Sequence, residues 1–193
     1  MTKANIMIVE DEVLIAQEIK ISLEGMGYGV TSIVKSGEQT IEKAVQDSPD
    51  LILMDIKLHG RMDGIETAEL IQSRLGIPVI FLTAFDDDDK IERAKLTMSY
   101  GYIIKPFRDR DLKVTIQMAL YAAKVDAERR KTEEKYSLLV KNLPGIVYKG
   151  YLDWSVEFFD NKIESLTGYS VDEFNSQKMK WIDIIVKEDI DNL

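Results

Sequence analysis

The stretch Ile6-Met7-Ile8-Val9-Glu10-Asp11-Glu12 places four apolar residues directly before three acidic ones. A continuous apolar run of this length is typical of a strand that is buried on both faces, as in a parallel sheet. The acidic residues then follow the carboxyl end of the strand, which is where sheets of this kind bind ligands. The stretch therefore predicts a parallel sheet with an acidic site at one edge.

Apolar runs of strand length recur through the first 121 residues, at 30–34, 51–54, 79–82 and 102–104. Segments with apolar residues at helical spacing alternate with these runs, at 13–26, 37–47, 63–74, 87–98 and 109–120. Strands that alternate with helices form parallel sheets whose two faces are covered by the helices. The pattern predicts an α/β fold with a doubly wound, five-stranded parallel sheet.

The residues at the predicted strand ends are all polar: Glu10, Asp11, Asp55, Thr83 and Lys105. Because the carboxyl ends of parallel strands meet at one edge, we expect all five side chains to face one crevice. Carboxylates packed together repel one another unless a cation lies among them, and carboxylate oxygens suit Mg²⁺. We interpret the three acidic residues as a Mg²⁺ site. A solvated acidic loop is the alternative that the spacing leaves open.

A hydroxyl and a cation complete the predicted crevice. Thr83, Lys105 and Mg²⁺ could each hold one oxygen of a phosphoryl group, because phosphoryl transfer depends mainly on positioning and charge neutralisation. Asp55 would then be the acceptor, as a carboxylate nucleophile. Taken singly, Thr83 could be a turn residue and Lys105 a surface charge. A phosphatase of the haloacid dehalogenase type would need a second acid two residues after the nucleophile, where this chain has Lys57.

Five motifs in order carry a resemblance that covers 1–121: Ile8-Val9-Glu10-Asp11-Glu12, Leu53-Met54-Asp55, Met62-Asp63-Gly64, Leu82-Thr83-Ala84 and Lys105-Pro106-Phe107. The set resembles the response regulator receiver domain, of the kind also found as the single-domain chemotaxis regulator. The resemblance implies the flavodoxin-like fold and a role in two-component phosphorelay signal transduction. It also implies that a histidine kinase or a phosphotransfer protein donates a phosphoryl group from a phosphohistidine to Asp55.

The resemblance implies Mg²⁺ as the cofactor of this phosphoacceptor site. Asp11 and Asp55 would bind the ion directly, Glu10 would bind it through water, and Lys57 would contribute its backbone carbonyl. Lys57 also stands at one of two positions that influence how fast the phosphoryl group is hydrolysed in the family; the other holds Phe85. A long basic side chain and a bulky apolar one could shield the phosphate, so we expect a long-lived phosphorylated state.

The resemblance further implies that Thr83 and Lys105 engage the phosphoryl group. The peptide bond between Lys105 and Pro106 should be cis, an isomer that is low in energy only before proline. Tyr102 matches the family's aromatic switch position. As Thr83 moves toward the phosphoryl group, Tyr102 would turn inward and repack the surface of the fourth helix, fifth strand and fifth helix. A strand aromatic with fixed packing is the alternative for Tyr102.

The chain changes character after the predicted sheet. Residues 122–135 are rich in Ala, Glu, Lys and Arg, which predicts a charged helical linker. Residues 136–193 resemble the N-terminal part of a PAS sensor domain, a partial α+β segment. The resemblance rests on Tyr136-Ser137-Leu138-Leu139, Leu143-Pro144-Gly145-Ile146-Val147-Tyr148, Leu166-Thr167-Gly168-Tyr169, Glu173-Phe174, and Trp181 with Lys187-Glu188-Asp189. Only two strands are predicted, at 146–152 and 156–159, where a PAS fold needs five. We therefore expect a truncated domain from a longer protein and assign no ligand residues.

Composition excludes several classes of protein. The chain has 193 residues with 25 basic and 34 acidic side chains, a net charge of −9, which argues against a nucleic-acid binder held by bulk charge. The lack of cysteine excludes disulfides and a thiol nucleophile, and a single histidine, His59, excludes a histidine-rich metal site. No apolar stretch approaches the roughly 18 residues of a membrane span. We expect a cytoplasmic protein with no membrane span.

Other hypotheses concern the whole protein. His59 should lie in a loop, so it is not the helix-borne phosphoacceptor of a kinase, and the sequence holds no kinase catalytic domain. The chain could nevertheless be the N-terminal input of a hybrid sensor histidine kinase whose catalytic domains follow residue 193. A ligand sensor whose receiver is no longer phosphorylated is a third hypothesis. A homodimer could form through the face of the fourth helix, fifth strand and fifth helix, or through the linker helix.

Overall fold

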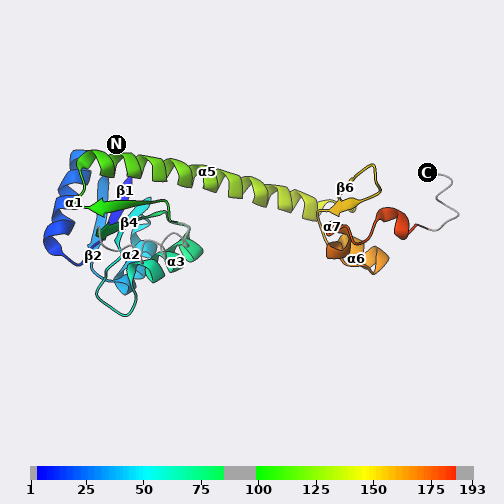
Figure 1. Ribbon diagram of the computed structural model, residues 1–193, viewed down its shortest axis with the longest axis horizontal. Helices are drawn as coiled ribbons and strands as arrows, with labels where there is room; N and C mark the ends of the chain where they lie inside the picture. Colours follow the sequence, from blue (N-terminus) through cyan, green and yellow to red (C-terminus); the bar gives the residue numbers. More distant parts are fainter. Residues whose placement is uncertain (1–3, 85–98, 186–193) are drawn as a thin grey trace. The chain divides into compact units, whose positions relative to one another are not determined.

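The computed structural model describes residues 4–84 and 99–185 (Figure 1). The predicted helix at 87–98 and Phe85 lie outside the described residues, as does Lys187-Glu188-Asp189. The chain divides into two compact units, Met1–Ala127 and Glu128–Leu193.

A five-stranded sheet forms the centre of the first unit. Its strands are β1 (Asn5–Val9), β2 (Gly29–Val34), β3 (Leu51–Asp55), β4 (Val79–Ala84) and β5 (Gly101–Lys105). Their order is β2-β1-β3-β4-β5, and every neighbouring pair is parallel. This is the flavodoxin-like order of a doubly wound sheet. The fold class predicted from the sequence is therefore confirmed.

Helices cover both faces of this sheet (Figure 1). They are α1 (Val13–Gly25), α2 (Gly37–Asp47), α3 (Gly64–Leu75) and α5 (Asp109–Asn142). Successive strand residues point to opposite faces. Accordingly Ile6 and Ile8 of β1 pack in one core with α1 and α5, while Met7 and Val9 pack in the other with α2 and α3. Because both faces are buried, the strands need the unbroken apolar runs seen in the sequence.

The start of α3 fixes one end of the loop that follows β3. Asp63 caps the helix and accepts a hydrogen bond at 2.8 Å from the Glu66 backbone N–H, while the Glu66 carboxylate accepts one at 3.1 Å from the Asp63 N–H. Such a reciprocal capping box satisfies two amide groups that have no partner within the helix. The loop 56–62 is thereby held between the last residue of β3 and a defined helix start.

Gly64 lets α3 come close to the end of β3. Its N–H donates to the Ile56 carbonyl at 3.1 Å. A Cβ at this position would overlap the backbone carbonyl oxygen of Asp55, which cannot turn away as a flexible side chain could. A residue without Cβ is therefore required where the helix meets the strand that carries Asp55.

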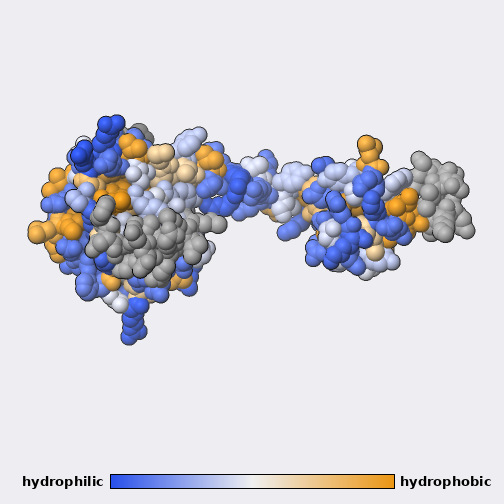
Figure 2. Space-filling view, in the orientation of Figure 1, coloured by the Kyte–Doolittle hydropathy of each residue, from blue (hydrophilic) through white to orange (hydrophobic). Residues whose placement is uncertain are grey.

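Helix α5 continues without a break through the predicted linker and ends at Asn142. Hydrophilic side chains cover its middle part (Figure 2). Lys162 closes its carboxyl end, because its Nζ donates to the Leu143 carbonyl at 2.6 Å and lies 3.4 Å from Asp160 Oδ2. A cation at this position is favoured by the negative end of the helix dipole. No helix among the described residues is long and apolar enough to cross a membrane.

The second unit is small. Its elements after α5 are β6 (Tyr148–Gly150), β7 (Val156–Phe158), α6 (Lys162–Thr167), α7 (Val171–Asn175) and the 3₁₀ helix η1 (Trp181–Asp183). The two strands are antiparallel and lie within the stretches predicted as strands. Their core contains Phe158, whose ring meets that of Phe174 edge-on with centroids 5.1 Å apart. Among the described residues, this unit therefore has two strands, and its core is correspondingly small.

The close approach at Gly64 yields a stability prediction. We expect Gly64→Ala to lower the free energy of unfolding by about 1–3 kcal/mol, because the added methyl group must displace backbone atoms. Gly25→Ala is the matched control: a Cβ at the end of α1 would meet nothing within 4 Å. Alanine there should raise the free energy of unfolding by up to about 1 kcal/mol. Urea unfolding measures both, and equal effects would contradict the assignment.

Candidate functional site

The acidic residues predicted at the strand ends meet in one pocket. Glu10 and Asp11 follow β1, and Asp55 is the last residue of the neighbouring strand β3. Each of the three offers a carboxylate oxygen, and these oxygens lie within 4.8 Å of one another. Strands β1 and β3 are where the order of a doubly wound sheet reverses, which opens a crevice at their carboxyl ends. The sheet topology therefore explains why the pocket forms here.

Lys105 enters this pocket from the end of β5. Its Nζ lies 2.6 Å from Glu10 Oε2 and 2.7 Å from Asp55 Oδ2, so one ammonium group bridges two carboxylates. Glu10 is fully buried, and such a carboxylate is costly without a partner. With all three acids ionised, the single ammonium group leaves an excess of negative charge. The pocket therefore attracts a further cation.

Burial also changes the protonation of these groups. Desolvation raises the pKa of Glu10 from 4.5 to about 7; the negative charge of Asp55 acts in the same direction, and the hydrogen bond from Lys105 opposes them. For Lys105, burial disfavours the charged form, but the hydrogen bonds to Asp55 and Glu10 outweigh it and raise the pKa above its ordinary value. Lys105 is therefore charged at neutral pH, while Glu10 can take up a proton there.

Asp55 is held at both carboxylate oxygens. Oδ1 accepts a hydrogen bond at 3.0 Å from the backbone N–H of Lys57, and Oδ2 faces Lys105. The side chain of Lys57 is exposed. These two contacts fix the direction of the carboxylate. Asp55 is 7% exposed, so it is still reachable at the edge of the sheet. A carboxylate held in this way can act as a nucleophile toward a group that enters the crevice.

Thr83 and Tyr102 occupy the two strands beyond β3. Thr83 is buried in β4, and its hydroxyl donates to the Ala84 carbonyl at 3.2 Å. Tyr102 is half-buried in β5, where its ring stacks on Phe81 with centroids 5.8 Å apart and its hydroxyl accepts a hydrogen bond at 2.7 Å from Ser99. Both side chains therefore have defined contacts in this state. The peptide bond between Lys105 and Pro106 is cis.

His59 contacts one member of the acidic cluster, which the sequence pattern did not predict. It lies in the loop between β3 and α3, and its Nδ1 contacts Asp11 Oδ2. The His59 side chain is 94% exposed, whereas that of Asp11 is 14% exposed. The two residues are 48 positions apart, and only the path of the loop brings them together. Sequence spacing carries no signal for this contact.

The donor set of the pocket fits Mg²⁺. Glu10, Asp11 and Asp55 supply carboxylate oxygens, the ligand type that Mg²⁺ prefers, and Lys105 leaves part of their charge uncompensated. A divalent cation would relieve the repulsion that helps to raise the pKa of Glu10. The chemistry of the residues present is therefore that of an oxygen-rich cation site beside a fixed carboxylate.

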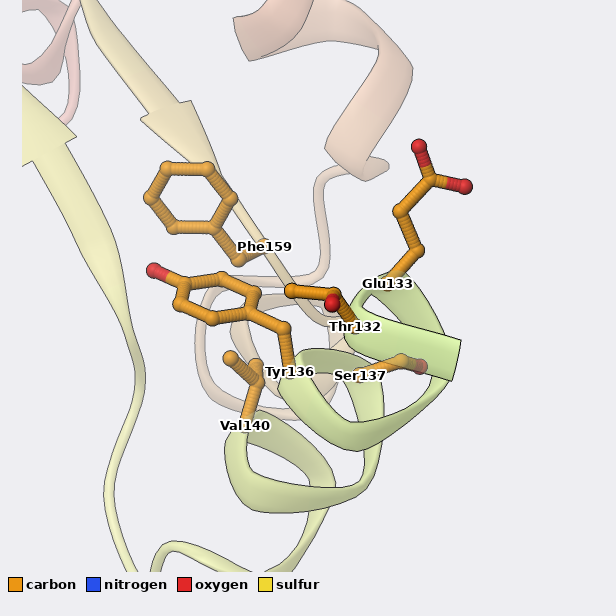
Figure 3. A pocket seen from close by; sticks show the side chains of 6 residues that line it. All are labelled: Thr132, Glu133, Tyr136, Ser137, Val140 and Phe159. Atoms are coloured by element: carbon orange, nitrogen blue, oxygen red, sulfur yellow. The ribbon is translucent and has the colours of Figure 1, made fainter. Parts of the chain in front are cut away.

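A second hollow lies within the second unit and has a different character (Figure 3). It encloses about 350 Å³ and is lined by Thr132, Glu133, Tyr136, Ser137, Val140 and Phe159. The rings of Tyr136 and Phe159 lie over Val140, while the carboxylate of Glu133 points away from them (Figure 3). The lining offers an apolar shape without converging polar groups. The acidic pocket is the stronger candidate for chemistry.

Comparison with known protein families gives a match over most of the first unit. The model of the response regulator receiver domain matches residues 6–117. The transcriptional regulatory protein PdtaR of Mycobacterium tuberculosis is 36% identical over 115 residues, which cover 60% of this chain and 56% of that protein. The alkaline phosphatase synthesis transcriptional regulatory protein PhoP of Bacillus subtilis is 32% identical over 143 residues, which cover 72% and 58% respectively. The chain thus spans little more than half the length of these relatives.

Solved structures match the same part of the chain. The signal receiver domain of a modulated diguanylate cyclase from Desulfovibrio desulfuricans aligns with a TM-score of 0.61 and 36% identity, over 64% of this chain and 98% of that one. The N-terminal domain of a response regulator/sensory box/GGDEF three-domain protein from Carboxydothermus hydrogenoformans aligns with a TM-score of 0.59 and 38% identity, over the same shares, 64% and 98%. Both are similar to this chain in fold and sequence.

The raised pKa of Glu10 predicts how stability depends on pH without metal. The folded protein binds this proton more tightly than the unfolded chain, so the contribution of Glu10 is complete below pH 4.5 and is lost as pH rises through about 7. In buffer with EDTA, we expect the free energy of unfolding to fall over this range. Glu10→Gln should remove most of the slope, because glutamine has no proton to lose.

Urea unfolding at a series of pH values measures this slope. Glu42→Gln is the matched control, since Glu42 is exposed on α2 and should leave the slope unchanged. An unaltered slope in Glu10→Gln would show that another group causes the dependence.

Proposed function

Because the chain belongs to the response regulator receiver domain family, we propose that its first unit accepts a phosphoryl group on Asp55 from a phosphohistidine. Receiver domains of two-component systems take phosphate from histidine kinases or phosphotransfer proteins, so a protein of one of these kinds is the donor. The observation that carries the proposal is the position of Asp55. Its carboxylate is fixed by Lys57 and Lys105 at the mouth of an oxygen-rich pocket.

The transfer needs little covalent chemistry from the protein. An Asp55 oxygen attacks phosphorus, the nitrogen–phosphorus bond of the donor breaks, and the donor imidazole leaves with the electron pair. Lys105 already contacts Asp55, and its ammonium group can form a new contact with the negatively charged phosphoryl oxygens after transfer. The Thr83 hydroxyl is bonded to a neighbouring carbonyl and can exchange that contact for a phosphoryl oxygen.

Mg²⁺ is the cofactor in this proposal. Glu10, Asp11, Asp55 and the backbone carbonyl of Lys57 would hold it, and the carboxylate cluster supports the assignment. Bound Mg²⁺ supplies charge neutralisation on the phosphoryl oxygens. Asp11 and Glu10 contribute charge and position, while Asp55 alone reacts.

Thr83 and Tyr102 form the switch in this proposal. When Thr83 turns toward the phosphoryl group, Tyr102 leaves its contact with Ser99 and turns inward from its present stacking on Phe81. The surface of β5 and α5 then repacks; the predicted fourth helix, at 87–98, lies outside the described residues. A homodimer that forms through this face or through the linker helix would respond to this change in the surface.

The second unit has a sensory role in this proposal. We assign 1–121 to the receiver, 122–135 to a helical linker and 136–193 to the N-terminal part of a PAS domain. The sensory box named in the Carboxydothermus relative supports this order, as does the antiparallel pair of β6 and β7. The cytoplasm is the location that suits a receiver. In the alternative proposal the chain is the input of a hybrid histidine kinase, and a phosphoacceptor histidine with an ATP-binding domain after residue 193 would decide for it.

Asp55→Asn tests the acceptor directly. We expect the protein to gain the mass of one phosphoryl group when it is incubated with acetyl phosphate and Mg²⁺, and the variant to gain none, because an amide is a poor nucleophile. Asp50→Asn is the matched control. Asp50 directly precedes the amino end of the same strand, is exposed, and accepts a hydrogen bond from the backbone N–H of Asn5. Labelling of Asp55→Asn at the normal rate would place the acceptor elsewhere.

Lys57 provides a second prediction, on the lifetime of the phosphorylated state. Its exposed side chain begins two residues after Asp55, where it can shield the phosphoryl group from water. Lys57→Ala should accelerate the loss of phosphate severalfold and leave labelling intact, because the backbone N–H that holds Asp55 remains. Decay of the phosphorylated mass after removal of the donor measures this rate. An unchanged rate would remove Lys57 from the proposal.

A further inference from the structure

His59 is the feature of the acidic pocket that phosphoryl transfer does not use. It is the only histidine of the chain, and its Nδ1 contacts Asp11 Oδ2. Asp11 is one of the three residues whose oxygens cluster in the pocket. An imidazole nitrogen therefore lies against one carboxylate of the cluster, on its solvent side.

The loop that carries His59 is held in place at several points. Its first part is fixed by the hydrogen bond from Lys57 to Asp55, and its end by the capping box of Asp63. Between them, the backbone N–H of Arg61 donates to Glu38 Oε1 at 3.3 Å. These contacts hold the backbone of the loop on both sides of His59 without involving the imidazole.

An imidazole changes which cations a carboxylate pocket prefers. Carboxylate and water ligands suit Mg²⁺, Ca²⁺ and Mn²⁺, whereas imidazole nitrogen suits Zn²⁺, Cu²⁺ and Ni²⁺. Affinity for mixed nitrogen and oxygen sites also rises along the series from Mn²⁺ to Cu²⁺. Three clustered carboxylates, one of which contacts an imidazole, could form a site of the mixed class.

We propose that His59 is a ligand of the cation bound in this pocket, so that the site accepts nitrogen-preferring divalent cations such as Co²⁺ and Cu²⁺ in addition to Mg²⁺. A cation bound to Asp11 replaces the contact between Asp11 and the imidazole by a shared bond to the metal. This inference rests on the proposed cation site of the carboxylates. It adds to that site the residue that sets its selectivity.

The experiment uses the full chain without a histidine tag. Calorimetric titration with Mg²⁺ and with Co²⁺ compares the protein with His59→Ala and with Arg61→Ala, a matched control in the same loop whose side chain is exposed. We expect His59→Ala to weaken Co²⁺ binding ~10-fold while Mg²⁺ binding changes less than about twofold, because only the nitrogen-preferring cation loses a favoured ligand. Arg61→Ala should resemble the unaltered protein with both cations.

Pulsed electron paramagnetic resonance of bound Cu²⁺ supplies a direct signature. A coordinated imidazole modulates the signal through its remote nitrogen, and only His59 can produce this modulation because the chain has one histidine. We expect the modulation in the unaltered protein and in Arg61→Ala. It should be absent in His59→Ala and in Asp11→Asn.

The outcomes separate this inference from the proposed function. Mg²⁺ binding without imidazole modulation, or an equal loss of Mg²⁺ and Co²⁺ affinity in His59→Ala, overturns the role of His59 and leaves the carboxylate site intact. Modulation that survives Asp11→Asn places the copper elsewhere and also overturns it. Failure of the unaltered protein to bind Mg²⁺ overturns the cation site itself, and the inference with it.

Discussion

The bridge from Lys105 to Glu10 and Asp55 is the interaction on which the rest of the site depends. It joins the carboxyl ends of β1, β3 and β5 through one ammonium group. Without it, a fully buried glutamate would face another carboxylate at short range, which is strongly unfavourable. With it, the carboxylates of Glu10 and Asp55 lie beside the Lys105 ammonium group, and the carboxylate of Asp11 lies at the mouth of the pocket. The residual negative charge is what makes the edge of the sheet a place for a metal ion and for phosphoryl chemistry.

Helix α5 links this site to the remainder of the chain. Ala119 of the helix is buried in the core of the first unit, and Val140 of the same helix is buried near its carboxyl end. Lys162 closes that end by donating to backbone carbonyl groups, so the last turn is tied to the start of α6. A rearrangement at β5 that moves α5 would therefore act on an element that belongs to both units.

Much of the fold was predictable because parallel strands that are buried on both faces have unbroken apolar sequences. The runs at 6–9 and 51–54 lie within β1 and β3, and the strand order of the sheet follows the doubly wound rule. The boundary after residue 121 was less predictable. Nothing in the charged stretch breaks a helix, so α5 runs on to Asn142, directly before the Leu143-Pro144-Gly145 stretch. Propensity alone does not tell a linker helix from the last helix of a domain.

The sequence by itself determined which residues meet at the carboxyl edge of the sheet, because strand ends in a parallel sheet share one edge. It identified Glu10, Asp11, Asp55, Thr83 and Lys105 without any knowledge of distances. Only the tertiary structure decided that Lys105 contacts two carboxylates, that burial raises the pKa of Glu10, and that His59 touches Asp11. These properties depend on loop paths and on exclusion of water, which arise from contacts between residues far apart in the chain.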